Sequence, residues 1–482
     1  MNFTHAQWVA LTPLIALTAT AVVAMVGIGV KRSHRGTLII TLAGLAISIW
    51  LLWPASRVAP VSVTPLLRID GYALFFIGLA AGAAFVVALF AWDYLQKMEP
   101  RCEEFYVLLV IAALGAAGLA ASADFVSFFL TLEILSVTLY GLNAYPRGRP
   151  LPLEAGIKYL VLAASSAAFL LFGMALVYAA TGTMTFAGLA ATLPHAPLNL
   201  LLPGSVLILV GIGFKLGLVP FHLWTPDVYQ GAPAPVTAFI ATASKAGIFA
   251  VLLRFFYEGA GLPHGRLFLV LTILAFASMV AGNLLALRQT NVKRILAYSS
   301  IAHMGYITVA FLAASRSAAM ASAAVAFYFL AYFITTLGAF GIISALTTSQ
   351  GEPDGIADYR GLFWRRPWLT LVFSAMLFSL AGIPLTAGFL AKFYIVAAAD
   401  ASSLWMLLIV LIITSVIGLF YYLRIVVALF SDPPASPAAD GPLLLRTART
   451  PACVLTVLLV ALVWIGVYPA TFIHMVLHLP LR

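Results

Sequence analysis

Residues 211–222 read GIGFKLGLVPFH, and residues 380–392 read LAGIPLTAGFLAK. Each stretch lies in a long apolar run and combines glycines and a proline with a lysine, Lys215 in the first and Lys392 in the second. Proline removes a backbone donor and frees a carbonyl, which is tolerated at membrane depth only beside protein or water. Both stretches therefore predict interrupted helices. Paired interrupted segments are typical of internally repeated transporter folds with a site near the midplane.

The composition around these stretches is that of a polytopic membrane protein. The 482 residues are 63% hydrophobic and only 9% charged, whereas a soluble domain carries about 25% charged residues. Apolar runs long enough to cross a hydrocarbon core of about 30 Å number about fourteen. They lie near residues 8–30, 37–53, 71–93, 105–121, 124–144, 155–181, 199–219, 235–258, 267–286, 294–313, 319–346, 367–398, 402–430 and 451–475. The sequence therefore predicts an all-α fold of about fourteen transmembrane helices.

Several other classes of protein are excluded. A content of 12% aromatic residues and two distant cysteines, Cys102 and Cys453, fits neither a disordered chain, a disulfide-stapled secreted domain nor a nucleic-acid-binding protein. No pair of histidines or cysteines has metal-site spacing, and no motif for a nucleotide, flavin, iron–sulfur cluster or haem is present. The first apolar run is followed by Lys31, Arg32 and Arg35, so we expect a retained helix rather than a cleaved signal peptide.

The 26 basic residues predict the orientation, because cytoplasmic loops carry the excess of Lys and Arg. Alternating loops place fifteen on one side, namely Lys31, Arg32, Arg35, Lys97, Arg101, Arg147, Arg149, Arg288, Lys293, Arg294, Arg360, Arg365, Arg366, Arg446 and Arg449. The other side receives six, namely Arg57, Arg68, Arg254, Arg266, Arg316 and Arg482. We therefore expect both termini outside the cytoplasm.

Five basic residues remain inside apolar runs, where a charge costs roughly 2.5 to 3.5 kcal/mol on insertion scales. They are Lys158, Lys215, Lys245, Lys392 and Arg424. Lys158 and Arg424 lie close enough to helix ends for their side chains to reach the headgroups, which is a purely structural role. Glu133 is the clear acidic counterpart within a span, either as a static partner of one lysine or as part of a proton path.

Lysines at such depth suggest proton transfer. Desolvation favours the neutral amine and a nearby carboxylate favours the ammonium, so a row of lysines with one glutamate can change protonation in sequence. A cation-selective channel would not be lined by lysines. Histidine side chains can titrate near neutrality, so His222 and His303 could extend the row, although isolated buried histidines are often structural.

A family resemblance rests on specific motifs that span nearly the whole chain. Residues 213–245 read GFKLGLVPFHLWTPDVYQGAPAPVTAFIATASK, and they resemble the signature of the antiporter-like membrane subunits of respiratory complex I. The Asp227-Val-Tyr-Gln-Gly-Ala-Pro233 version is similar to that of the N-type subunits of NADH:quinone oxidoreductase. Residues 289–300 (QTNVKRILAYSS), 358–363 (DYRGLF) and 382–388 (GIPLTAG) add support.

The resemblance implies fourteen helices with two inverted five-helix units, each with one broken helix. Carried over to this chain, Glu133 pairs with Lys215, Lys245 relays protons toward the centre, and Lys392 serves the exit half. Lys158 also matches a family lysine. It further implies that this chain binds no flavin, cluster, nicotinamide or quinone, since NADH and quinone bind to other subunits. The implied partners are lipids and neighbouring K- and M-type membrane subunits, in a bacterial inner membrane; no nucleic acid is expected.

We accordingly expect four regions: residues 1–104 with three helices, 105–258 and 259–430 with the two five-helix units, and 431–482 with a loop and the last helix. The expected function is proton translocation coupled to NADH oxidation and quinone reduction in other subunits. Three alternatives stay open: a cation/proton antiporter subunit, a hydrogenase-linked complex subunit, and a structural membrane anchor that does not pump. Co-purifying subunits, gene neighbours and charge-neutralising substitutions would separate them.

Overall fold

The computed structural model describes residues 3–99, 101–260, 265–314, 318–433, 449–470 and 472–473. In these ranges, thirteen helical segments are long and apolar enough to cross a membrane. A further crossing consists of two shorter helices, α16 (Pro367–Ala381) and α17 (Ala387–Ala401). The predicted all-α polytopic membrane fold is confirmed.

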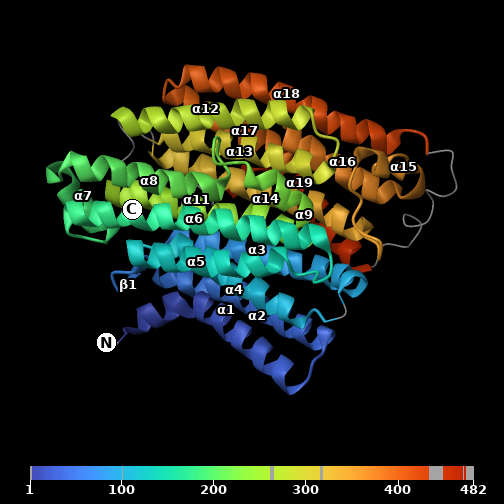
Figure 1. Ribbon diagram of the computed structural model, residues 1–482, viewed down its shortest axis with the longest axis horizontal. Coiled ribbons are helices and arrows are strands. Elements are labelled where there is room, and N and C mark those ends of the chain that lie inside the picture. Colours follow the sequence, from blue (N-terminus) through green and yellow to red (C-terminus); the bar gives the residue numbers. More distant parts are fainter. Residues whose placement is uncertain are drawn as a thin grey trace.

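The crossings lie roughly parallel in Figure 1, in layers that run from α1 and α2 at the lower edge to α18 at the upper edge. The uninterrupted crossings are α1 (His5–Val30), α2 (His34–Val58), α3 (Gly71–Met98), α4 (Glu103–Ala121), α5 (Phe125–Asn143), α6 (Pro150–Thr181), α12 (Gly265–Leu287), α13 (Val292–Ala313), α14 (Ala318–Leu346), α18 (Trp405–Phe430) and α19 (Arg449–Val467). Shorter helices in the loops are α7 (Phe186–Thr192), η1 (Leu193–His195), η4 (Ile356–Tyr359) and α15 (Leu362–Arg365).

Two crossings are broken by the same backbone motif. Helix α8 (Leu198–Leu216) ends at Gly217 and α16 ends at Gly382, and both glycines have the left-handed conformation, with φ of 73° and 87°. The next amide reaches back five residues in each case, from Leu218 to Gly213 O at 2.8 Å and from Ile383 to Phe378 O at 3.0 Å. A C-cap of this kind depends on glycine, and the glycines in residues 211–222 and 380–392 are the sequence feature that predicts it.

The first broken crossing extends further than the sequence predicts. The apolar run was expected to end at residue 219, but the helix resumes as α9 (Trp224–Gly231). The polar residues of α9 hide it from a hydropathy pattern. The following crossing is buried and irregular: α10 (Ala234–Phe239) continues through a π-helical turn at Ile240–Ser244 into α11 (Lys245–Arg254), and a second π-helical turn covers Phe255–Ala260.

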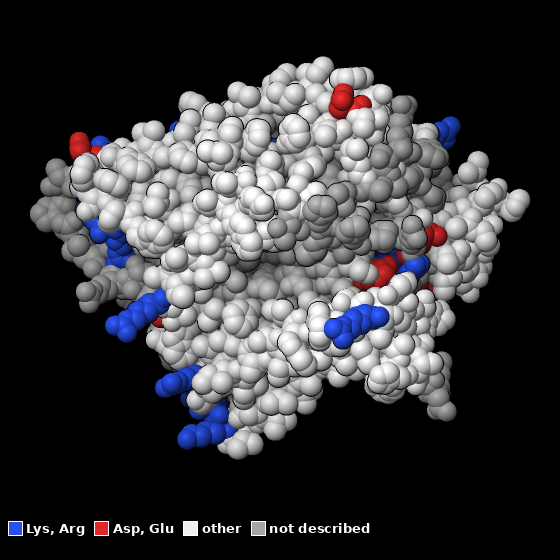
Figure 2. Space-filling view, turned by 180° about the vertical axis from the view of Figure 1, so that it is seen from behind, with Lys and Arg blue, Asp and Glu red and all other residues white. Residues whose placement is uncertain are grey.

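The loops gather at two opposite ends of the bundle. We call the end with the loops after α1, α3, α5, α12 and α14 the basic face, and the opposite end the hairpin face. Segments at the basic face contact one another directly. Lys97 Nζ, in the last turn of α3, donates to Thr347 O at 2.8 Å, and Arg149 donates to Ser349 O at 2.8 Å. Figure 2 shows a wide uncharged band with Lys and Arg side chains toward its two ends.

Most of the predicted sorting of basic residues agrees with these connections. Arg316, Arg446 and Arg482 lie outside the described residues. Arg254 was assigned to a loop, and that prediction is wrong: it lies at the end of α11 with 0% of its surface exposed. The error arose because a pattern of loop charges does not show which span ends are covered by other parts of the protein.

The hairpin face carries a two-stranded sheet that the sequence analysis did not predict. Strands β1 (Val61–Val63) and β2 (Leu67–Ile69) pair antiparallel, with Val61 opposite Ile69. The turn between them contacts the loop after α4, since the amide of Ala123 donates to Leu66 O at 2.9 Å. Three-residue strands give almost no alternation from which to predict them.

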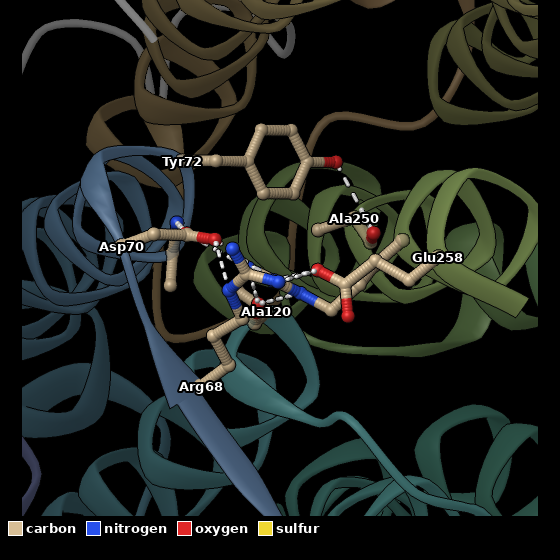
Figure 3. Close-up of polar contacts among 8 residues, drawn as sticks. Arg68, Asp70, Tyr72, Ala120, Ala250 and Glu258 are labelled. Carbon is tan, nitrogen blue, oxygen red and sulfur yellow. Dashed lines mark hydrogen bonds and ion pairs between the residues drawn. The ribbon is translucent and has the colours of Figure 1, made fainter. Parts of the chain in front are cut away.

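Arg254 holds this face together through a buried ion-pair cluster. Its partners Asp70, Glu258 and Ala120 are labelled in Figure 3. Its two terminal nitrogens donate to the two oxygens of Asp70 at 2.8 Å, and one of them also donates to Glu258 at 2.8 Å. Arg254 also donates to Ala120 O, at the end of α4, while Arg68 on β2 pairs with Glu258 at 3.2 Å. Asp70 caps α3 as well, so one guanidinium joins α3, α4 and α11.

We expect Arg254→Leu to lower the free energy of unfolding by about 3 to 5 kcal/mol, because removing one partner of a buried ion pair leaves carboxylates uncompensated. Thermal unfolding of the purified full chain in detergent measures the change. Arg35 is exposed and has no side-chain partner among the described residues, so Arg35→Leu should change stability by no more than about 0.5 kcal/mol. Equal stability of the two variants would contradict the clamping role of Arg254.

Candidate functional site

Lys215 lies in the last turn of α8, beside the first helix break, and only 3% of its surface is exposed. Its Nζ donates to Ser136 Oγ on α5 at 2.6 Å and lies 5.8 Å from the ring centroid of Tyr159. Glu133 precedes Ser136 by about one turn of α5, and its Oε1 is buried without a hydrogen-bond partner in the described part of the chain. Lys215 thus contacts the serine next to the predicted glutamate, with no ion pair between Lys215 and Glu133.

Lys245 begins α11, directly after the first π-helical turn, and is fully buried. Its Nζ donates to Ser300 Oγ on α13 at 2.7 Å. It also borders the break of α8, because a β-carbon at Gly217 would lie 3.6 Å from this nitrogen and 2.7 Å from Thr225 Oγ1. The first break therefore brings the ends of α8 and α9 against the second predicted lysine.

Ser300 connects Lys245 to an aromatic cluster around His303. The hydroxyl of Tyr332 donates to Ser300 Oγ at 2.9 Å, and its ring centroid lies 5.2 Å from that of His303. His303 Nδ1 is hydrogen-bonded to Tyr328 at 2.7 Å, and Nε2 lies 3.3 Å from the hydroxyl of Tyr422. His303 lines one very small pocket together with Ser379 and Gly388 of the second break.

Lys392 on α17 closes the second break. Its Nζ donates to Ala381 O, the last carbonyl of α16, and to Ser415 Oγ on α18, both at 2.8 Å. It lies 5.4 Å from the ring centroid of Tyr306. A cation at the C-terminal end of a helix is stabilised by the exposed carbonyls and the helix dipole. The ammonium of Lys392 therefore replaces the hydrogen bond that the break removed.

The other predicted residues have different surroundings. The Lys158 side chain is 43% exposed and pairs with Glu154 at 2.7 Å and Asp227 at 2.9 Å. These residues and Arg294 line a pocket of about 190 Å³. His222 lies in the first break with its Nδ1 buried and unpartnered among the described residues. Arg424 donates to Leu287 O and Gln289 O, so it caps the end of α12.

The structure brings Glu133, Lys215, Lys245 and His222 to the first break and Lys392 to the second, with His303 between Lys245 and the second break. Sequence reasoning missed the uncharged partners of the lysines, which are the hydroxyls of Ser136, Ser300 and Ser415 and the rings of Tyr159, Tyr229 and Tyr306. Serine and tyrosine are common in apolar spans and carry no charge, so only the contact reveals them. No group of three His, Cys, Asp or Glu in the described ranges is placed to hold a metal ion.

Three comparisons connect this geometry with known proteins. Residues 122–418 match the family described as NADH:quinone oxidoreductase/Mrp antiporter, TM. A curated protein of Ectopseudomonas mendocina (strain ymp), NADH-quinone oxidoreductase subunit N, is 45% identical over 483 residues, covering 99% of this chain and 97% of that protein.

Two solved structures share the fold. A chain of respiratory complex I from Thermus thermophilus, with bound aureothin, gives a TM-score of 0.81 at 34% identity, covering 96% of this chain and 98% of that chain. A chain of the membrane-bound sulfane sulfur reductase, an archaeal respiratory membrane complex, gives 0.85 at 28% identity, covering 98% and 96%.

The matched region includes both helix breaks and all of the predicted site residues. The curated relative extends the match to both ends of the bundle at high identity. The chain therefore belongs to the NADH:quinone oxidoreductase/Mrp antiporter family of membrane subunits, and within it to the NADH-quinone oxidoreductase subunit N proteins.

Proposed function

We propose that this chain is a proton-translocating membrane-arm subunit of an NADH:quinone oxidoreductase. The observation that carries the proposal is the burial of Lys215, Lys245 and Lys392 beside the two helix breaks, without an ion pair to a carboxylate in the described ranges. Buried ammonium groups are costly, so they persist in membrane proteins mainly where they serve transport. The 45% identity to a curated subunit N selects the complex among the family's transport functions.

In the proposed mechanism, quinone reduction in neighbouring subunits changes the electrostatic field at Glu133. A shift of the Glu133 carboxylate away from Lys215 favours release of the lysine's proton, which passes through water and Lys245 toward Lys392. The hydrogen bond of Lys215 to Ser136, one turn from Glu133, is consistent with the separated form. Buried polar atoms without protein partners at Thr225 and His222 mark the break as a place for ordered water.

His303 is proposed as a relay between the two halves, because it lies between the Lys245 and Lys392 surroundings within a ring of tyrosines. His222 is proposed as a partner of water in the first break. Lys158 is the weakest member of the proposed set. Its ion pairs and exposure connect it to the surface of the bundle rather than to the buried row.

We further propose the partners and the membrane location of the chain. Its partners would be the other membrane subunits of the complex, with K- and M-type subunits as neighbours, and lipids. NADH, quinone, flavin and clusters would belong to other subunits, leaving this chain without a cofactor. The membrane would be a bacterial inner membrane, with the basic face toward the cytoplasm and both termini periplasmic, following the distribution of Lys and Arg.

We also propose that residues 105–258 and 259–430 are inverted five-helix units, with residues 1–104 and 431–482 as flanking segments. The repeated C-cap at Gly217 and Gly382 supports this division, because the two breaks are the most distinctive backbone feature of each unit. A cation/proton antiporter and a hydrogenase-linked subunit remain the transport rivals, and a non-pumping anchor is the structural one. The 45% identity to a curated subunit N favours the NADH:quinone oxidoreductase over these rivals.

Lys215→Ala should lower proton pumping by the assembled enzyme at least about tenfold, since a positioned acid or base typically contributes about 10²- to 10⁴-fold to proton transfer. Pumping is measured as acidification of inverted membrane vesicles on addition of NADH, with quinone reduction followed in parallel. Undiminished pumping with normal quinone reduction would overturn the proposed function. Assembly of the complex is checked on native gels, so that a misassembled variant is recognised.

Lys158→Ala provides a lysine comparison outside the buried row. We expect pumping within about threefold of the native enzyme, because an exposed ion pair contributes only about 0 to 1 kcal/mol. The measurement is the same acidification assay at matched quinone-reduction rates. A loss as large as that of Lys215→Ala would place Lys158 on the proton path.

A further inference from the structure

Four lysines are buried among the described residues, and one of them, Lys293, pairs with Glu352. The other three, Lys215, Lys245 and Lys392, have matching surroundings, which we call the serine–tyrosine seats. In each seat the ammonium donates to a serine Oγ and faces a tyrosine ring. The seats are Lys215 with Ser136 and Tyr159, Lys245 with Ser300 and Tyr229, and Lys392 with Ser415 and Tyr306. The Nζ to Oγ distances are 2.6, 2.7 and 2.8 Å, and the Nζ to ring-centroid distances are 5.8, 5.6 and 5.4 Å, in that order.

The match is not a consequence of local sequence. Each serine lies on a different helix from its lysine, namely Ser136 on α5, Ser300 on α13 and Ser415 on α18. The tyrosines likewise come from three helices, α6, α9 and α13. Three independent tertiary contacts have therefore produced the same partner chemistry around the same kind of group.

A hydroxyl suits a lysine that gains and loses a proton. It accepts a hydrogen bond from the ammonium, and after the proton has left it rotates to donate to the lone pair of the free amine. A carboxylate accepts only and favours the ammonium, so it would hold the lysine in one state. The ring face adds a weak attraction for the cation without offering a competing site for the proton.

We propose that Ser136, Ser300 and Ser415 are positioning residues that hold the three lysines in place in both protonation states, and so allow the proton to pass. The inference rests on the proposed function of the lysines as the proton path. It assigns to each lysine a named hydroxyl partner that keeps its hydrogen bond when the charge is gone. The serines themselves neither gain nor lose a proton overall.

The Lys245 seat is the one to test first, because its serine, Ser300, makes the most contacts of the three serines. Ser300 accepts from Lys245 and from Tyr332 and lies 3.3 Å from the hydroxyl of Tyr229. Through Tyr332 it also reaches the ring of His303. Loss of this hydroxyl would therefore leave Lys245 without its hydrogen-bond partner at the point where the two halves meet.

The experiment compares Ser300→Thr, Ser300→Ala and Ser300→Asp in the assembled enzyme, as protons pumped per NADH in inverted vesicles over a range of pH. We expect Thr to stay within about twofold of native, because it keeps the hydroxyl, and Ala to lose about tenfold, the effect of a 1.4 kcal/mol loss. Asp should move the pH dependence of pumping to higher pH by about one unit or more, because a carboxylate favours the charged amine.

Ser374 is the matched control. It is a buried serine on α16 whose Oγ has no partner among the described residues. Ser374→Ala should leave both pumping and its pH profile unchanged. The same Ala and Thr changes at Ser415, which is only partly buried, repeat the test where the extra methyl of Thr meets less crowding.

The outcomes separate the inference from the function on which it rests. In one outcome, Lys245→Ala does not pump, whereas Ser300→Ala and Ser415→Ala keep the native pumping and the native pH profile. This result would overturn the positioning role of the serines and leave the lysine path standing. In another outcome, the Ala and Thr variants lose pumping equally at both Ser300 and Ser415, and Ser300→Asp does not shift the pH dependence of pumping. This result would show that the serines contribute only packing, and it would also overturn the proposal. Native pumping by Lys245→Ala and Lys215→Ala would instead remove the function itself.

Discussion

A helix that stops inside a membrane leaves carbonyl groups without partners, and in hydrocarbon nothing replaces the missing hydrogen bonds. This constraint shapes the middle of the protein. Gly217 and Gly382 end α8 and α16 in a left-handed cap that returns one amide to the helix end. Lys392 supplies a further donor to Ala381 O, and Lys245 lies beside the cap of α8. At the second break, the cap and the buried cation thus stabilise each other.

Buried charge is handled in two different ways in this chain. At the hairpin face, Arg254 is held by Asp70, Glu258 and a backbone carbonyl, so every part of its guanidinium has a fixed partner. Arginine stays charged, and such a cluster is suited to holding helices in register. In the middle of the bundle the cations are lysines, and each donates to a serine hydroxyl, with the carbonyl of Ala381 as a second acceptor for Lys392. The ion-pair cluster keeps the arginine in its charged state, whereas the serine hydroxyls are compatible with both the charged and the neutral state of a lysine.

This difference connects the fold with the family's activity. The protonation of lysines that have no carboxylate partner responds to a change in the local electrostatic field, because little else in their surroundings fixes their charge. Glu133 is the nearest acidic candidate to impose such a change, one turn from the serine that Lys215 binds. The π-helical turns on either side of α11 place Lys245 and Arg254 at opposite ends of one short rigid segment. The static cluster therefore also fixes the helix from which the central lysine projects.

The sequence by itself determined the crossings, the two breaks and the charged residues at them, because hydropathy, glycine, proline and lysine act locally along the chain. It ended the first broken helix too early at residue 219, since the polar α9 carries no apolar signal, and it placed Arg254 in a loop. Only the tertiary structure decided what each lysine touches. Ser136, Ser300 and Ser415 lie 79, 55 and 23 residues from their lysines. An uncharged hydroxyl gives no pattern in a sequence, and its role arises from the packing of one helix against another.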